Sequence, residues 1–261
     1  MKNLAVLFGM FTCLTLSAQT GKDFSCQTLK NNPGNFRSSD PSNMRSDSID
    51  ILNYNIDLEI IDFTNKTING HCDIRFNPKM NGISSVSFDL LLLTIDSVVQ
   101  NGTTLPYSYN DTLLVVNLTA PVNEGDTNTI SVYYRGQPQM DPSGWGGFYY
   151  QNGYAWNLGV GFESVPHNYG RVWFPCFDNF VERSTYSFHI TTAQGKVAVC
   201  NGQLLNETII SGDTITRHWQ LNEEIPSYLA CVAVAEYETV RQNHSGINGA
   251  IPIELYAKAA D

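Results

Sequence analysis

The sequence predicts an all-β fold, namely an antiparallel double-layer or saddle-shaped β-sandwich. Apolar and polar residues alternate with a period of two along most of the chain, which is typical of half-buried strands. Turn signals such as NGTT, NEGD and SGDT separate the alternating runs. No run has apolar residues at the 3.6-residue spacing of a helix. With 261 residues, of which 42% are hydrophobic, the chain has enough apolar material for one large core.

The first two strands are the clearest. Apolar residues at every second position from Leu52 to Ile60 predict one strand, and the same pattern from Ile68 to Phe76 predicts the next. The short turn between them makes an antiparallel hairpin the expected pairing. Further strands are expected near residues 84–89, 91–99, 104–109, 112–118, 129–135, 184–192, 196–200, 213–221, 227–236 and 251–258.

The N-terminus predicts export. One positive charge precedes a mostly apolar run of thirteen residues, 4–16, and small residues follow it, which is the layout of a signal peptide over residues 1–18. Residues 19–47 are polar and rich in turn formers, so we expect a flexible linker there. Residues 48–261 then form one β-domain. The expected location is secreted or periplasmic, and no other stretch reaches the ~20 apolar residues of a transmembrane anchor.

Charge and residue spacing exclude several functions. Fifteen Lys and Arg stand against 25 Asp and Glu, a formal charge of −10, so a nucleic-acid partner is not expected. The chain has no HExxH sequence, no CxxC pair and no two histidines four residues apart. We therefore expect no metal ligand, no catalytic residue and no bound cofactor in this chain. Three histidines, His71, His189 and His218, fall on polar strand faces, whereas His167 lies in a loop and its role stays open.

The segment Gly144–Phe180 departs from simple alternation. It holds three of the four tryptophans together with many glycines and tyrosines. Aromatic rings offer rigid contact area, and glycine lets a backbone approach closely. Such a segment could be a platform for a carbohydrate, the lining of a peptide cleft, or an aromatic structural corner.

A specific family resemblance lies in the same segment. Gly161-Phe-Glu-Ser, followed by Gly170-Arg-Val-Trp-Phe-Pro-Cys-Phe-Asp178, resembles a signature in the N-terminal β-domain of the aminopeptidase N family of zinc metallopeptidases, which includes leukotriene hydrolase. The sequence departs from that signature at Gly161, Ser164 and Asn179-Phe180, where the family has Gln, Pro and Glu-Pro. The residues that match at the family's spacing are Arg171, Phe174, Pro175, Cys176, Phe177 and Asp178.

The resemblance implies a role for each half of the signature. It implies that Glu163, flanked by Gly161 and Phe162, helps to bind the free α-ammonium group of a peptide substrate. It implies a structural role for Arg171–Asp178, which would brace the loop. In the family, zinc is held by an HExxH motif and a further Glu in a separate catalytic domain, so zinc is expected there and not in this chain.

Two functions follow as hypotheses. In the first, the chain is the substrate-flanking domain of a secreted zinc aminopeptidase, it requires a catalytic domain as partner, it is inactive alone, and it ends at a domain boundary, as a fragment would. In the second, it is a stand-alone exported β-sandwich module that binds a peptide or glycan through the aromatic segment 144–156.

Overall fold

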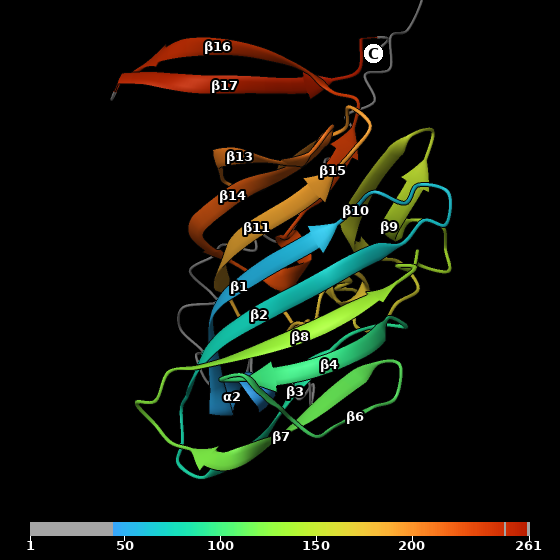
Figure 1. The fold of residues 1–261 in the computed structure, drawn as a ribbon. Helices are drawn as coiled ribbons and strands as arrows, with labels where there is room; N and C mark the ends of the chain where they lie inside the picture. Colours follow the sequence, from blue (N-terminus) through green and yellow to red (C-terminus); the bar gives the residue numbers. More distant parts are fainter. Residues whose placement is uncertain (1–43, 248, 260–261) are drawn as a thin grey trace, which may run out of the picture. The chain divides into compact units, whose positions relative to one another are not determined.

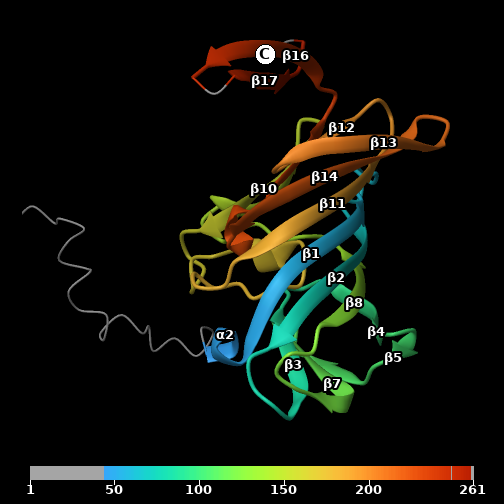
Figure 2. The same cartoon turned by 90° about the vertical axis from the view of Figure 1, so that its left-hand side faces the viewer.

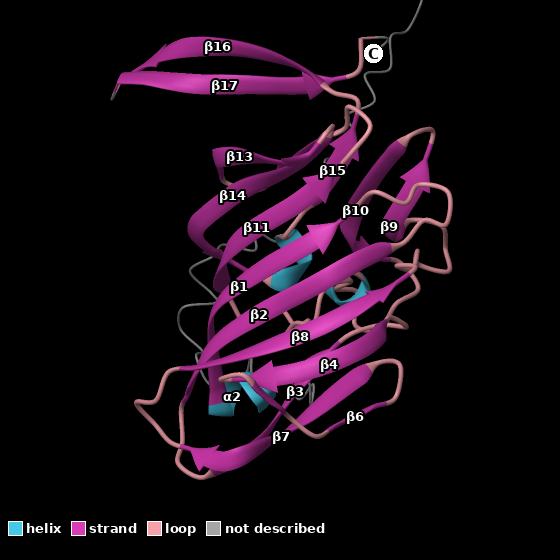
Figure 3. Ribbon diagram, in the orientation of Figure 1, coloured by secondary structure: helices cyan, strands magenta, loops and turns pink. Residues whose placement is uncertain are grey.

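The computed structural model describes residues 44–247 and 249–259, and almost all of its regular structure is β-strand (Figure 1; Figure 3). The predicted signal peptide and residues 19–43 of the predicted linker lie outside the described residues. Residues 44–47 of that linker are described, and Arg45 to Asp47 belong to a one-turn helix, α2 (Arg45–Ser48). The Arg45 guanidinium forms an ion pair with Asp89. None of the described helices is long and apolar enough to cross a membrane.

The largest element is an eight-stranded sheet that curves through the molecule (Figure 2). Its strands are arranged in the order β13 (Gln203–Ser211), β14 (Thr214–Ile225), β11 (Ser184–Thr192), β1 (Ile49–Glu59), β2 (Ile68–Pro78), β8 (Asn128–Gly136), β4 (Thr94–Gln100) and β5 (Thr103–Thr104).

Strands β1 and β2 form the predicted antiparallel hairpin, which is interrupted by one β-bulge. The pairing register shifts between Ile51 and Asn53. Such a bulge inserts an extra residue and turns the following side chains to the other face. Ile51 is therefore buried, whereas Leu52, which the alternation assigned to the core, is only half-buried. Beyond the bulge, Tyr54 and Ile56 point into the core as the alternation predicts.

One pairing in this sheet is parallel. Strands β1 and β11 run side by side in the same direction, with Tyr54 opposite Tyr186 and Asp57 opposite His189. A parallel neighbour needs a long crossover connection, and here more than 120 residues of chain separate the paired positions. The other pairings between named strands are antiparallel, as the sequence predicts.

Three smaller sheets complete the described part of the chain. The first is three-stranded, the second carries the candidate site, and the third is a hairpin whose Tyr256 packs against Trp219. In order, they comprise β3 (Ile83–Asp89), β7 (Leu113–Val122) and β6 (Tyr107–Tyr109); β12 (Val197–Cys200), β15 (Val232–Ala235), β10 (Tyr154–Gly161) and β9 (Gly146–Gln151); and β16 (Glu238–Gly246) with β17 (Gly249–Ala257).

The core lies on one face of the eight-stranded sheet. The inward side chains of its central strands are buried, and the segment containing the short 3-10 turn η2 (Gly170–Val172) packs beneath them. Phe174 from this segment meets Tyr54 edge to face, at 5.3 Å between ring centroids. A second such turn, η3 (Ser227–Leu229), contacts η2 and β10. The core therefore anchors the segment that follows the candidate site.

Candidate functional site

The candidate site is the loop after β10, and a buried carboxylate shapes it. Strand β10 ends at Gly161, and a Cβ atom added there would lie 2.2 Å from Oδ2 of Asp141. Only glycine leaves room for that carboxylate, because contacts this short do not occur between real side chains. Any residue with a side chain at this position, such as the Gln of the family signature, would therefore collide with Asp141.

Asp141 fixes the backbone of the loop. Its two carboxylate oxygens accept from the backbone N–H of Glu163 at 3.2 Å and of Ser164 at 2.9 Å, and Oδ2 also accepts from the Ser164 hydroxyl at 2.6 Å. Within its own turn, Asp141 also accepts at Oδ1 from the backbone N–H of Ser143, at 3.0 Å. Burial would raise the pKa of Asp141, but the donors from Ser143 and Ser164 outweigh it and hold the pKa well below its ordinary value.

Glu163 is exposed at the tip of this fixed loop. Its backbone is held by Asp141, and no ion pair to its own carboxylate occurs among the described residues. The preceding side chain, Phe162, is 65% exposed and lies 4.6 Å from the ring of Trp145. An exposed carboxylate on a fixed backbone can accept charge-assisted hydrogen bonds from an ammonium group.

His167 closes the base of the same loop. The backbone N–H of Gly161 donates to the His167 carbonyl at 2.9 Å, and Nδ1 of His167 lies 3.0 Å from the Gly161 carbonyl. Val160 and Asn168 also form a bridge next to this pair. These contacts give His167 a position in the framework of the loop.

Arg171 and Asp178 form a buried ion pair behind the loop. Nη1 of Arg171 lies 3.1 Å from Oδ2 of Asp178, and the same nitrogen donates to the Asn168 carbonyl at 2.9 Å. Asp178 also accepts from the backbone of Gly170, the backbone of Arg171 and the hydroxyl of Ser227. Burial raises the pKa of Asp178, and these donors, led by Arg171, oppose that rise.

The rest of the signature enters the core. Phe174, Cys176 and Phe177 are buried, and Pro175 lies between them in a buried stretch. Cys176 exchanges two backbone hydrogen bonds with Asp89, at 2.8 and 3.0 Å. The Tyr54 hydroxyl accepts from the backbone N–H of Phe177 at 2.8 Å. The structure thus brings the signature residues 171–178 together as one packed unit and leaves Glu163 and Phe162 exposed.

Sequence reasoning missed Asp141, the residue that organises the loop. It lies more than 20 residues from Glu163 in sequence, so no local pattern links the two. A signal was nevertheless present, because Asp141-Pro142-Ser143-Gly144 is a typical turn sequence in which the Asp side chain bonds to the backbone two residues on. The neighbouring segment 144–156, which we expected to depart from simple strand alternation, is largely the β9–β10 hairpin, with Tyr149 and Trp156 stacked at 4.9 Å.

Metal ligands do not gather in the part of the chain that the structure describes. No group of three or more His, Cys, Asp or Glu side chains there could hold a metal ion. His71, His189 and His218 lie on the outer face of the eight-stranded sheet, and the rings of His189 and His218 stack at 4.0 Å. Four free cysteines are described, of which Cys231 is exposed and the other three, Cys72, Cys176 and Cys200, are buried.

The fold resembles solved metallopeptidases. An M1 zinc metallopeptidase from Deinococcus radiodurans superimposes with a TM-score of 0.69 at 19% identity. A variant of an M1 zinc metallopeptidase from the same organism, bound to a Tyr-Ser-Ala substrate, gives a TM-score of 0.70 at 19% identity. Each match covers 79% of this chain and 47% of the other, so this chain spans less than half of these structures.

Comparison of sequences identifies the family. A curated relative, transcription initiation factor TFIID subunit 2 from Schizosaccharomyces pombe, is 27% identical over a match that covers 50% of this chain and 14% of the relative. Residues 51–229 match the Peptidase M1 N-terminal domain, which is more than half of the chain. The chain therefore belongs to the M1 peptidase family, of which it carries the N-terminal β-domain.

Proposed function

We propose that this chain is the substrate-flanking domain of a secreted zinc aminopeptidase and that Glu163 binds the free α-ammonium group of the peptide. The observation that carries the proposal is the exposed Glu163 carboxylate on a loop whose backbone Asp141 fixes. Membership of the M1 family supports the reaction class. The Tyr-Ser-Ala ligand in a structurally similar enzyme supports a peptide as the substrate class.

The chemistry of such a role is recognition. A carboxylate that faces an ammonium group makes charge-assisted hydrogen bonds, and such bonds contribute about 1.5–3 kcal/mol each. An acetylated N-terminus has no positive charge and would leave Glu163 without a partner. The site would therefore favour peptides with a free amino end and orient the first peptide bond for hydrolysis elsewhere.

The partner in this proposal is a catalytic domain that would cover the exposed apolar side chains near the loop. Phe162 and Trp145 form one exposed pair, and the exposed Phe180 packs on the half-buried Tyr228 at 5.4 Å between ring centroids. The second pair lies next to the Arg171–Asp178 ion pair, because the hydroxyl of Ser227, the neighbour of Tyr228, donates to Asp178. Exposed apolar clusters of this kind are typical of surfaces that a partner covers.

Zinc would be held by that catalytic domain. The described residues of this chain offer no group of ligands that fits the ion, so the hydrolytic step is not assigned to them. We accordingly expect the 261-residue chain alone to leave an aminoacyl arylamide substrate intact. Hydrolysis by the purified chain would contradict this part of the proposal.

The role of Glu163 is tested by Glu163→Gln in the aminopeptidase that carries this chain. Loss of the charge should lower kcat/KM about 10- to 100-fold, the range expected for one charge-assisted hydrogen bond. Glu124→Gln is the matched control, because Glu124 is also exposed but lies in the turn between β7 and β8. Equal kinetics for the two variants would reject the proposed role.

A second function is favoured by one of the comparisons. The curated relative is named as a subunit of a transcription initiation factor, so a related domain occurs in a protein with an assembly role. If this chain serves only as a binding module, its partner should bind it equally well with Glu163→Gln, and no peptidase activity should depend on that residue. The same kinetic comparison separates the two functions.

A further inference from the structure

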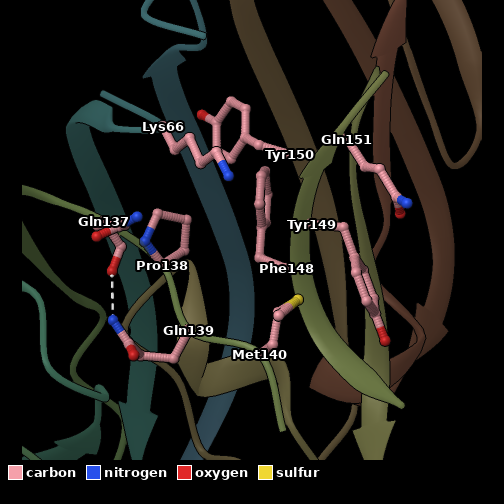
Figure 4. A pocket seen from close by; sticks show the side chains of 9 residues that line it. All are labelled: Lys66, Gln137, Pro138, Gln139, Met140, Phe148, Tyr149, Tyr150 and Gln151. Carbon is pink, nitrogen blue, oxygen red and sulfur yellow. Dashed lines mark hydrogen bonds between the residues drawn. The ribbon is translucent and has the colours of Figure 1, made fainter. Parts of the chain in front are cut away.

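A pocket lies at the outer edge of β9, and Glu163 is not among the residues that line it (Figure 4). It has a volume of about 480 Å³, which is within the range of small-molecule sites. Strand β9, the segment that leads into it from β8, and the β1–β2 turn surround it. The lining residues are Lys66, Gln137, Pro138, Gln139, Met140, Phe148, Tyr149, Tyr150 and Gln151.

The pocket forms where two backbone segments part. The backbone N–H of Phe148 donates to the Gln139 carbonyl at 2.9 Å, and Met140 bridges to Gly147. Beyond Phe148 this pairing ends, and the segment 137–138 diverges from β9. Pro138, Met140 and Phe148 give the resulting space apolar walls, which suit the hydrocarbon part of a ligand.

Lys66 is the sole charged residue among those that line the pocket. Figure 4 shows its side chain reaching toward the ring of Phe148. Among the described residues it has no ion pair, even though the chain carries a formal charge of −10. The carboxylate of its own turn, Asp62, instead accepts from the backbone and side chain of Asn65, at 2.8 and 2.7 Å.

The framework around Lys66 is already in place. Lys66 has a left-handed backbone, with φ of 59°, in a turn that a hydrogen bond from Thr67 to the Asp62 carbonyl closes at 3.2 Å. The Tyr150 hydroxyl donates to the Thr67 carbonyl at 2.9 Å and ties the turn to β9. Gln139 is held by its bond to the Gln137 carbonyl at 2.8 Å. A ligand would therefore meet a site that needs little ordering.

We propose that this pocket binds a small organic carboxylate, whose apolar body lies against Pro138, Met140 and Phe148 and whose charge pairs with Lys66. Charge complementarity selects the ligand class, because an ammonium group without an ion pair stands beside an apolar wall and the lining has no acidic residue. The site is independent of the role proposed for Glu163.

Calorimetric titration of the whole chain with phenylacetate and with hexanoate tests the proposal, and phenylacetamide is the neutral comparison. We expect saturable binding of the two carboxylates with Kd of ~1 mM or tighter, and binding of the amide at least about tenfold weaker. Lys66→Gln should weaken binding of the two carboxylates at least about tenfold and leave binding of phenylacetamide unchanged. Lys66 is exposed, so the variant should fold.

Lys79→Gln is the matched control. It removes the same charge, but Lys79 pairs with Asp50 at 3.1 Å and does not line the pocket. It should bind both carboxylates like the wild type. Three outcomes would overturn the proposal: carboxylate binding that Lys66→Gln leaves intact, equal binding of acid and amide, or no saturable binding of either acid up to ~10 mM.

Discussion

The loop of residues 161–167 and the segment of residues 170–178 are neighbours in sequence and opposites in character. The loop keeps its functional group, the Glu163 carboxylate, exposed, and Asp141 holds only its backbone. The segment buries its carboxylate, Asp178, and surrounds it with Arg171, Ser227 and two backbone donors. Both carboxylates belong to one family signature, yet their surroundings suit one to ligand recognition and the other to support.

The difference shows two ways in which this β-domain uses a carboxylate. A buried, fully bonded carboxylate has no capacity left for a ligand, but it makes the backbone around it rigid. An exposed carboxylate becomes specific only when its backbone is fixed, and here the fixing is done by a second buried acid, Asp141. Substitution of the buried carboxylate should therefore lower stability, whereas substitution of the exposed one should affect binding.

The largest effect on stability is expected at Asp178. Asp178→Ala would leave Arg171, whose side chain is only 13% exposed, without its counter-ion, and loss of one partner of such a largely buried pair costs about 3–5 kcal/mol. Unfolding in urea, followed by Trp fluorescence, measures the loss. Asp178→Asn retains the shape and one acceptor and should lose less, which keeps the test readable if the alanine variant fails to fold. Glu163→Gln should keep an unfolding free energy within about 0.5 kcal/mol of the wild type. If Asp178→Ala were equally stable, the contrast between the two carboxylates would be wrong.

A smaller effect is expected at Gly161. Gly161→Ala introduces a methyl group 2.2 Å from Oδ2 of Asp141 and should destabilise the protein by about 1–3 kcal/mol through overpacking. In an Asp141→Ala background the carboxylate is gone and only the Cβ of residue 141 remains, at 3.1 Å, so the added cost of Gly161→Ala should fall clearly. A double-mutant cycle in urea measures this coupling. Additive effects of the two substitutions would show that Asp141 does not fill the space at Gly161.

The smallest expected effect is the pH dependence of stability that comes from His189, which lies outside both segments. Burial lowers the pKa of His189 below 6.5, and the stacked ring of His218 lowers it further, together with His71 and against Asp57 and Asp73. The unfolded chain then binds this proton at higher pH than the folded one. The contribution of neutral His189 to the free energy of unfolding is therefore complete above about pH 6.5, and it is lost as the pH falls toward the pKa of the folded state.

Chemical unfolding between pH 7.5 and 5 measures this dependence. His218→Gln removes the neighbouring charge and should make the fall in stability shallower. His244→Gln, in the exposed strand β16, is the control and should leave the dependence unchanged. An identical pH profile for wild type and His218→Gln would contradict the assigned cause.

Local alternation predicted much of the sheet. The β1–β2 hairpin and the strands β8, β11 and β14 fall close to the expected ranges, because each has one buried and one polar face. Strands β9 and β10 were not expected, since Gly146, Gly147 and a run of aromatic residues hide their alternation. Strand β13 was missed because nearly all of its side chains are exposed.

Long-range features were beyond sequence reasoning. The parallel pairing of β1 with β11 joins positions more than 120 residues apart, and no local signal marked the bulge after Ile51. The same holds for the contact between Asp141 and the Glu163 loop. The predicted role of Glu163 comes from the family resemblance and stays a prediction, whereas the surroundings of Arg171 and Asp178 are seen directly in the structure.

The most direct test of the central claim compares a peptide that has a free amino end with its N-acetylated form, as inhibitors of the aminopeptidase that we propose carries this chain. The wild type should bind the free peptide about 10- to 100-fold more tightly, and Glu163→Gln should lose most of that preference while its unfolding free energy stays unchanged. An unchanged preference in a stably folded Glu163→Gln variant would show that Glu163 does not recognise the amino group.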